Sequence, residues 1–275
     1  ALAVGGEALP DGDGYRVRGR WHFGSGIRHA NWVMGSVAVP SAAPPHNVQI
    51  AVVPREQVEI DDNWHVAGLR GTGSCDFAMP DLHVPAAFMI PAVAVGEGAP
   101  ARGGALYRMG FPGFVAMEHA AIALGIGRRT LEESTRRAQE KLRGGLVAGT
   151  QAASIGSRAR YQGDLGRAEM KLRAARALAF DVTGEAWAVA RSGEVPPPRL
   201  QAAMRAAARE ATDVAIDVAA MAYRYAGGSG LFETDPIQRA LRDVQAASQH
   251  FVVADSAFEA LGQLRLGIEG AHPMQ

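Results

Sequence analysis

Residues 11–23 read DGDGYRVRGRWHF, and this stretch indicates the fold of the first part of the chain. Residues 11–14 form a turn signal, because Asp-Gly pairs favour the tight backbone of a reversal. Tyr15, Val17, Trp21 and Phe23 then follow in loose alternation with polar residues, which is the period of a strand with one buried face. We therefore expect a β-strand directly after a turn.

Further short β-rich runs continue to about residue 100. NWVMGSVAVP (31–40) and VQIAVVP (48–54) each end at a proline, and FAMPDLHV (77–84) alternates again. Pro80 within the last run suits an edge strand or a bulge, because proline has no N–H for the ladder. Repeated short strands at this spacing predict a β-sandwich or small barrel over residues 1 to about 100.

The composition changes after about residue 100 and becomes rich in Ala, Glu, Arg and Leu. Glycines at 227, 228 and 230 are typical of a helix end, and Pro236 suits the first position of the next helix. We expect helices from Phe114 to Lys141, Gly163 to Arg191, Leu200 to Ala226 and Pro236 to about Leu264. Four such helices predict a four-helix bundle over residues 101–275, so the chain is expected to be an α+β protein of two domains.

Composition narrows the functional classes. Lys plus Arg equals Asp plus Glu, at 28 each, so charge gives no argument for nucleic acid or an anionic membrane as partner. No apolar run approaches the ~20 residues that a membrane-spanning helix needs. Cys75 is the single cysteine, which excludes an intramolecular disulfide and fits a reducing cytoplasm. No group of His, Cys or carboxylates has the spacing of metal ligands, so we expect no metal site.

Four segments, in this order, resemble the acyl-CoA dehydrogenase superfamily. They are GRWHFGSG (19–26), WHVAGLRGTGSCDF (64–77) with the following DLHVP (81–85), GGSG (227–230) and QRALRD (238–243). Each segment alone is a weak signal, whereas the ordered set covers most of the chain. The resemblance implies a middle β domain followed by a C-terminal helical bundle, with an N-terminal helical domain before them. We therefore expect the chain to be a fragment of a longer protein, and the bundle to associate as a homodimer or homotetramer.

The same resemblance implies a flavin, either FAD or FMN. A strand bearing Trp lines the isoalloxazine ring in that family, and an aromatic wall with a few nearby donors is what a flavin ring requires. Small residues let the backbone approach a ligand closely, and the glycine-rich turn approaches the dinucleotide of a neighbouring subunit. The resemblance thus assigns flavin contacts to Trp21, Phe23, Ser25, Gly26, Thr72, Ser74, Gly227, Gly228 and Ser229.

The residue at the family's catalytic position shifts the expected chemistry. Acyl-CoA dehydrogenases remove a proton with a Glu carboxylate there, whereas this chain has Phe251, preceded by His250. AASQH (246–250) resembles the branch of two-component flavin monooxygenases, which take reduced flavin from a separate reductase. In that branch His250 would be the catalytic residue near an aromatic or similar apolar small-molecule substrate. Imidazole can deprotonate a phenol-like substrate or hydrogen-bond to the peroxide formed from O2.

Two alternatives to a monooxygenase stay open at this point. One is an acyl-CoA dehydrogenase with a displaced base, for which Glu118 is the candidate. The other is an inactive fragment or scaffold. Arg242 and Asp243 are expected to be structural, because an Arg-Asp pair at a helix start can satisfy backbone groups or tie subunits together.

Overall fold

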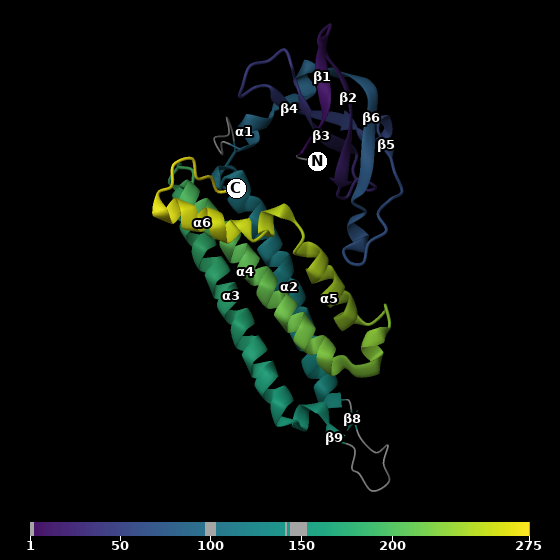
Figure 1. Cartoon of the computed structure of the whole chain (residues 1–275), viewed down its shortest axis with the longest axis vertical. Helices are drawn as coiled ribbons and strands as arrows, with labels where there is room; N and C mark the ends of the chain where they lie inside the picture. The colour runs from purple at the N-terminus through teal and green to yellow at the C-terminus, as the bar shows by residue number, and fades with distance from the viewer. Residues whose placement is uncertain (1–2, 97–102, 141, 144–152, 275) are drawn as a thin grey trace. The chain divides into compact units, whose positions relative to one another are not determined.

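The computed structural model describes residues 3–96, 103–140, 142–143 and 153–274. The chain divides into two compact units, Ala1–Ala101 and Arg102–Gln275, which we call the β unit and the helical unit (Figure 1). The expected domain boundary at residues 100–101 and the expected helix end at Lys141 lie outside the described residues.

The β unit holds one mixed seven-stranded sheet in the order β5-β6-β2-β1-β3-β4-β7. Its strands are β1 (Val4–Asp11), β2 (Gly14–Gly24), β3 (Trp32–Ala38), β4 (Val48–Pro54), β5 (Glu59–Ile60), β6 (Cys75–Pro85) and β7 (Met89–Pro91), and the short helix α1 (Ala92–Gly96) follows. The sequence suggested a sandwich or small barrel. The described strands form one continuous sheet, because β1 pairs antiparallel with β2 and parallel with β3 and so joins the two groups of strands.

Two local predictions for the β unit are confirmed. The turn after Asp11 is the reversal between β1 and β2, since Asp11 pairs with Gly14 across it. Pro80 lies at an irregularity of the β2–β6 ladder, where the register shifts, and the next residue, Asp81, has φ of 63°. Because a bulge interrupts the ladder at this point, the ladder loses no hydrogen bond to the missing N–H of proline.

Trp21 organises the core of the β unit. Its side chain is 1% exposed, its ring stacks on Phe77 at 5.3 Å between centroids, and its indole N–H donates to the Ser36 carbonyl at 2.9 Å. A Cβ at Gly35 would lie only 2.7 Å from the indole, so the glycine makes the room that the ring fills.

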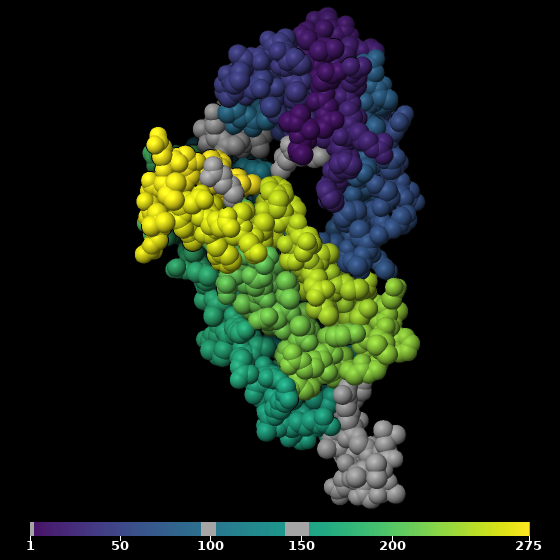
Figure 2. Space-filling model, in the orientation of Figure 1, coloured from purple at the N-terminus to yellow at the C-terminus, as the bar shows by residue number. Residues whose placement is uncertain are grey.

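The helical unit is a bundle around α4. Its helices are α2 (Phe111–Glu140), α3 (Ala159–Arg191), α4 (Pro198–Ala226), α5 (Pro236–Ala247) and α6 (Ser256–Leu266), and β8 (Leu142–Arg143) pairs with β9 (Ala153–Ser154). α4 packs against α2, α3, α5 and α6, and the surface of α5 and α6 covers one side of it (Figures 1 and 2). Alanines dominate its buried face and allow close helix packing. Among the described helices, none is both long and apolar enough to cross a membrane.

The expected fourth helix is broken, which corrects the sequence prediction of one helix from Pro236 to about Leu264. α5 ends at Ala247, a 3-10 turn covers Phe251–Val253, and α6 begins at Ser256. The break turns Val252 and Val253 into the core, where both are fully buried. Burial of two valines, each worth roughly 1.5–3 kcal/mol, outweighs the loss of a few helical hydrogen bonds that side chains replace.

Candidate functional site

An aromatic pair, with Phe23 exposed and Trp64 partly buried, marks one end of β2. Phe23 is 70% exposed and has φ of 60°, and its ring meets the edge of Trp64 at 6.2 Å between centroids. A non-glycine residue in the left-handed region costs about 1–2 kcal/mol, and here no burial of the phenyl ring offsets that cost. Strain of this kind collects at ligand-binding positions, so Phe23 and Trp64 form a candidate wall for a flat ligand.

A chain of three hydroxyls lies in the same unit. The Oγ atoms of Ser25 and Ser74 are 2.8 Å apart, Ser74 Oγ and Thr72 Oγ1 are 2.7 Å apart, and Thr72 Oγ1 donates to the Leu69 carbonyl at 2.9 Å. The Gly26 N–H donates to the Thr72 carbonyl at 2.8 Å, which fixes the two loops against each other.

The direction of this hydroxyl chain follows from its protons. A carbonyl only accepts, so the Thr72 proton points at Leu69 and Thr72 must accept from Ser74. Ser74 has then used its proton and must accept from Ser25. The half-exposed end of the chain, Ser25 Oγ, therefore presents lone pairs rather than a proton.

The expected flavin contacts of the β unit divide into two groups. Ser25, Gly26, Thr72 and Ser74 come together, although the two segments are about fifty residues apart in the sequence. Trp21 does not join them, because its ring is buried in the core, and this corrects its expected place against a flavin. Trp64, which contacts Phe23, was not among the flavin contacts expected from the sequence.

His250 lies in the break between α5 and α6, beside His119 of α2. The two imidazole rings are 4.2 Å apart between centroids with an interplanar angle of 31°. His250 has extended backbone geometry at the start of the Phe251–Val253 turn, and its Nδ1 accepts from the Val252 N–H at 3.3 Å. Because Nδ1 accepts, the proton of the neutral ring is on Nε2.

Both histidines are held neutral. Burial, followed by the charge of the neighbouring His119, lowers the pKa of His250 to about 4. Burial also lowers the pKa of His119. Two half-buried imidazoles in contact therefore form an uncharged pair at neutral pH. His119 was missed by sequence reasoning, which pointed one residue earlier to Glu118, and Glu118 is exposed on α2.

The glycine-rich turn links α4 to α5 at the other end of α5. Gly227 has φ of 66°, Gly227 and Gly228 are exposed, and the Ser229 hydroxyl donates to the Ala226 carbonyl at 3.0 Å. A Cβ at Gly228 would meet nothing within 4 Å, so the backbone there is open to a ligand.

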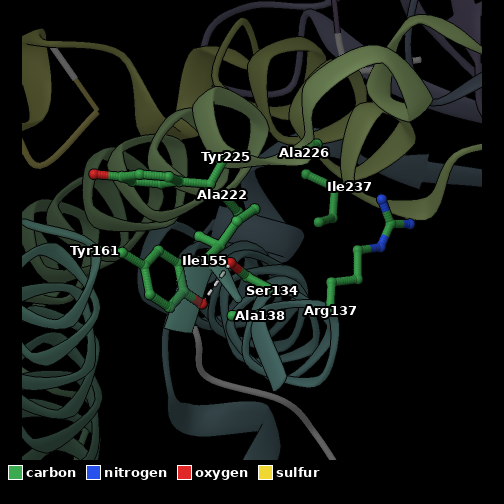
Figure 3. Close-up of a pocket in the computed structure, with 9 residues that line it drawn as sticks. All are labelled: Ser134, Arg137, Ala138, Ile155, Tyr161, Ala222, Tyr225, Ala226 and Ile237. Atoms are coloured by element: carbon green, nitrogen blue, oxygen red, sulfur yellow. Dashed lines mark hydrogen bonds between the residues drawn. The ribbon is translucent and has the colours of Figure 1, made fainter. Parts of the chain in front are cut away.

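A small cavity lies inside the bundle near this turn. Residues of α2, α3, α4 and α5 line it, and Ser134 and Tyr161 hydrogen-bond at its wall with 3.1 Å between their hydroxyl oxygens (Figure 3). Its volume of about 10 Å³ suits a single water molecule and excludes a flavin or an aromatic substrate.

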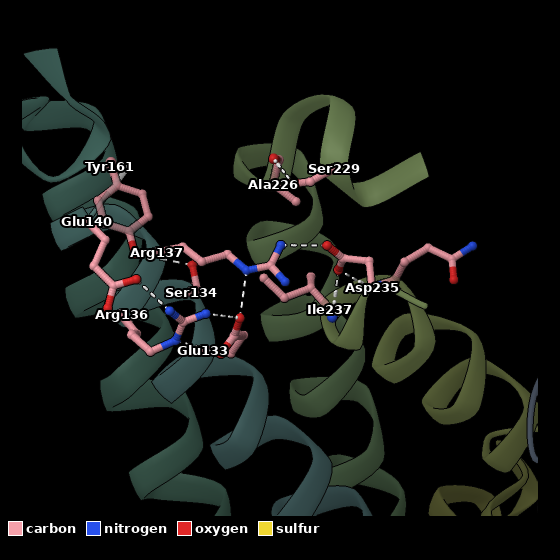
Figure 4. A network of polar contacts seen from close by, with 11 residues as sticks. Glu133, Ser134, Arg136, Arg137, Glu140, Tyr161, Ala226, Ser229, Asp235 and Ile237 are labelled. Carbon is pink, nitrogen blue, oxygen red and sulfur yellow. Dashed lines mark hydrogen bonds and ion pairs between the residues drawn. The ribbon is translucent and has the colours of Figure 1, made fainter. Parts of the chain in front are cut away.

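A buried ionic network holds the start of α5 (Figure 4). Arg137 of α2 contacts Glu133 at 2.7 Å and Asp235 at 2.6 Å, and Asp235 also accepts from the N–H groups of Ile237 and Gln238. The hydrogen bond from Arg136, opposed by burial and supported by Arg137, lowers the pKa of Glu133 to about 2. These charges are mutually compensated, so we regard the network as structural.

The Arg242-Asp243 pair lies inside α5 rather than at its start, which corrects its expected place. Arg242 donates to Gln238 Oε1 within the same helix at 2.8 Å and to the Glu233 carbonyl at 3.3 Å. The second bond ties α5 to the segment before it.

Comparison with known proteins gives a consistent picture. The family model for the acyl-CoA dehydrogenase C-terminal domain matches residues 117–255. Indole-3-acetate monooxygenase of Pseudomonas putida is 28% identical over 254 residues, covering 92% of this chain and 63% of that protein. Pigment production hydroxylase of Rhodococcus sp. (strain ATCC 21145) is 30% identical over 267 residues, covering 95% and 67%. XiaF from Streptomyces sp., solved with FADH2 and glycerol, superposes with a TM-score of 0.85 at 23% identity, covering 97% and 68%.

The chain thus spans about two thirds of the length of these proteins, and less than that of the first. The match to the family model includes both His119 and His250.

Proposed function

The chain belongs to the acyl-CoA dehydrogenase family, and from that premise we propose that it is part of a flavin-dependent monooxygenase acting on an aromatic or similar apolar substrate. The observation that carries the proposal is the neutral His119–His250 pair beside Phe251, the position where the resemblance implies a carboxylate base in a dehydrogenase. The names of the relatives, a monooxygenase and a hydroxylase, support it.

The residues of the β unit fit a flavin. Phe23 and Trp64 offer an aromatic wall, and the backbone of Phe23 is in the left-handed region. Ser25 offers an acceptor oxygen at the end of the hydroxyl chain. The N5 atom of a reduced flavin carries a hydrogen, whereas N5 of an oxidised flavin does not. The direction of the hydroxyl chain therefore suits the reduced form.

When bound, reduced flavin supplies two electrons for the splitting of O2, with one oxygen atom entering the substrate and the other leaving as water. His250 contributes a hydrogen-bond donor through Nε2–H, because its Nδ1 is engaged with Val252. A base with a pKa of about 4 is too weak to deprotonate a phenol at neutral pH. Of the two roles open to the imidazole, donation to an oxygen atom of the bound reactants is the one that its geometry supports.

The proposal implies two kinds of partner. A flavin reductase would supply reduced FMN or FAD, and a second copy of the chain would place the Gly227–Ser229 turn against the flavin of its neighbour. The exposed backbone of that turn supports the second point.

The function is tested with the intact protein, a flavin reductase, labelled O2 and indole-3-acetate together with simple phenols as probes. We expect one labelled oxygen atom in the product, and a loss of turnover in His250→Ala of about 10²–10⁴-fold with the fold retained by circular dichroism. His83→Ala, an exposed histidine of β6, is the matched control and should keep its turnover. Release of all the labelled oxygen as hydrogen peroxide with every probe would contradict the proposal.

The flavin contacts are tested by binding. Ser25→Ala should weaken the binding of reduced FMN or FAD about 3–10-fold, the worth of one hydrogen bond, and change the binding of the oxidised form less. Ser192→Ala removes a hydroxyl bonded to a helix carbonyl and serves as control. Equal effects of Ser25→Ala on the binding of both redox forms would show that Ser25 does not accept a hydrogen bond from N5 of the reduced flavin.

Acyl-CoA dehydrogenation is the second candidate. Phe251 supplies no base, and the expected substitute, Glu118, is exposed one position away from the residue that contacts His250. Bleaching of bound FAD by an acyl-CoA without oxygen would support this candidate over the first.

A further inference from the structure

The segment that follows His250 is held by two arginines of α4. Arg205 is 1% exposed, and its guanidinium donates to the carbonyls of Val252 at 3.1 Å and Phe251 at 3.3 Å, and also to that of Pro273. Arg209, one helical turn later, donates to the carbonyl of Val253 at 3.1 Å. The two side chains therefore bind three successive carbonyls of the turn.

The Phe251 carbonyl also accepts from the Ala254 N–H at 3.4 Å, whereas Arg205 and Arg209 supply the donors for the carbonyls of Val252 and Val253. A buried carbonyl with no donor carries a free-energy cost, so without the two arginines the carbonyls of Val252 and Val253 would make the turn unstable. The two guanidinium groups remove that cost from one side, while His119 contacts the imidazole from α2.

We propose that Arg205, assisted by Arg209, is a positioning residue that fixes the turn after His250 and thereby holds the imidazole against His119 with Nε2–H as its donor. The catalytic importance of this positioning role rests on the proposed monooxygenase function, whereas the placement of His250 by Arg205 does not. The Nδ1 bond to Val252 belongs to this arrangement, because the N–H and the carbonyl of Val252 are both engaged, one by His250 and the other by Arg205.

The residue type suits the task. A guanidinium presents five N–H donors in a rigid plane and stays protonated even where burial lowers its pKa, as at Arg205. An ammonium group is compact and cannot reach the carbonyls of two separate segments from one position. Arg205→Lys should therefore keep the positive charge without keeping the hydrogen bonds to the carbonyls of both segments.

Among the described residues, the charged and titratable groups that contact His250 or its turn come from α2 and α4. His119 contacts it from α2, and Arg205 and Arg209 contact the turn from α4. Arg209 is in turn paired with Asp213 and Asp255, each at 3.0 Å. Release of the turn would expose the imidazole to water, and its pKa would then rise from about 4 toward the ordinary 6.5.

The experiment is NMR of the histidine side chains in the intact protein without flavin, with His250 assigned by its loss in His250→Gln. In the unmodified protein we expect His250 to titrate near pH 4 as the Nε2–H tautomer. In Arg205→Met its pKa should rise toward 6.5 and the two tautomers should mix, with Arg205→Lys between the two. Arg137→Met removes a partly buried arginine at the other end of α5 and should leave the pKa and tautomer of His250 unchanged.

An unchanged pKa and tautomer of His250 in folded Arg205→Met would overturn the inference. If Arg205→Met does not fold, Arg205→Lys and Arg209→Met are read by the same criterion. The outcome is independent of the proposed function, because the measurement needs no flavin. A shifted His250 together with a failure to hydroxylate any probe would uphold the positioning role and reject the monooxygenase.

Discussion

The two ends of α5 are both fixed by arginines from neighbouring helices, but in different ways. At the first end Arg137 of α2 contacts two buried carboxylates, Glu133 and Asp235. At the second end Arg205 and Arg209 of α4 contact backbone carbonyls of the turn that follows His250. The first end balances charge with charge, whereas the second orders a non-helical segment beside two neutral imidazoles.

This difference indicates that the two ends of α5 have different roles. Paired charges fix a helix start and offer little to a ligand, because their hydrogen-bonding capacity is used within the network. Guanidinium groups on carbonyls leave the nearby side chains available, and His250 keeps its Nε2–H. The first end is therefore a structural joint, and the second is where we place the chemistry.

The largest expected effect is at the structural end. Arg137→Met leaves the buried carboxylate of Asp235, 5% exposed, without its guanidinium, and leaves Glu133, 7% exposed, with Arg136 alone. Breaking a buried pair in this way should lower the free energy of unfolding by about 3–5 kcal/mol in denaturant titrations. Arg128→Met breaks an exposed pair with Glu132 on the same helix and should cost no more than ~0.5 kcal/mol. Similar losses in both variants would erase the distinction that we draw.

An intermediate effect on the stability of the fold is expected when the pH is lowered. The pKa of His250 is lowered in the folded state, so its neutral form stabilises the fold fully above pH 6.5 and progressively less as the pH falls toward 4. Glu133, with a pKa of about 2, contributes stability above pH 4.5 that is lost only below that value. Thermal melts of the unmodified protein should show both phases, and His250→Gln should lack most of the first.

The control for this titration is Glu133→Gln, which should lose the phase below pH 4.5 and keep that between pH 6.5 and 4. The opposite pattern would mean that the two ends do not titrate separately.

The smallest expected effect comes from the partner ring. His119→Phe keeps a ring beside His250 but removes the charge that contributes, after burial, to its low pKa. The pKa of His250 should therefore rise, by less than in Arg205→Met, because burial is the larger cause. NMR titration measures both shifts, and a larger rise in His119→Phe would make the ring contact, rather than the arginines, the dominant constraint.

Much of the architecture could be predicted from local pattern. The strands β2, β3, β4 and β6 and the helices α2, α3 and α4 match the expected runs within a few residues. Alternation and helical spacing record which face of an element is buried, and that information is local. Ser25 and Thr72 could be assigned to one cluster only through the family resemblance, since no local rule pairs residues so far apart.

The sequence by itself determined the strand-then-helix order, the turn after Asp11 and an edge or bulge at Pro80. Only the tertiary structure decided that Trp21 is a core residue, that the last expected helix is broken, and that His119 and Arg205 meet the His250 turn. The physical reason is distance along the chain. Arg205 satisfies the carbonyl of Val252 from 47 residues earlier, and a hydrogen bond of that span leaves no periodic trace in either segment.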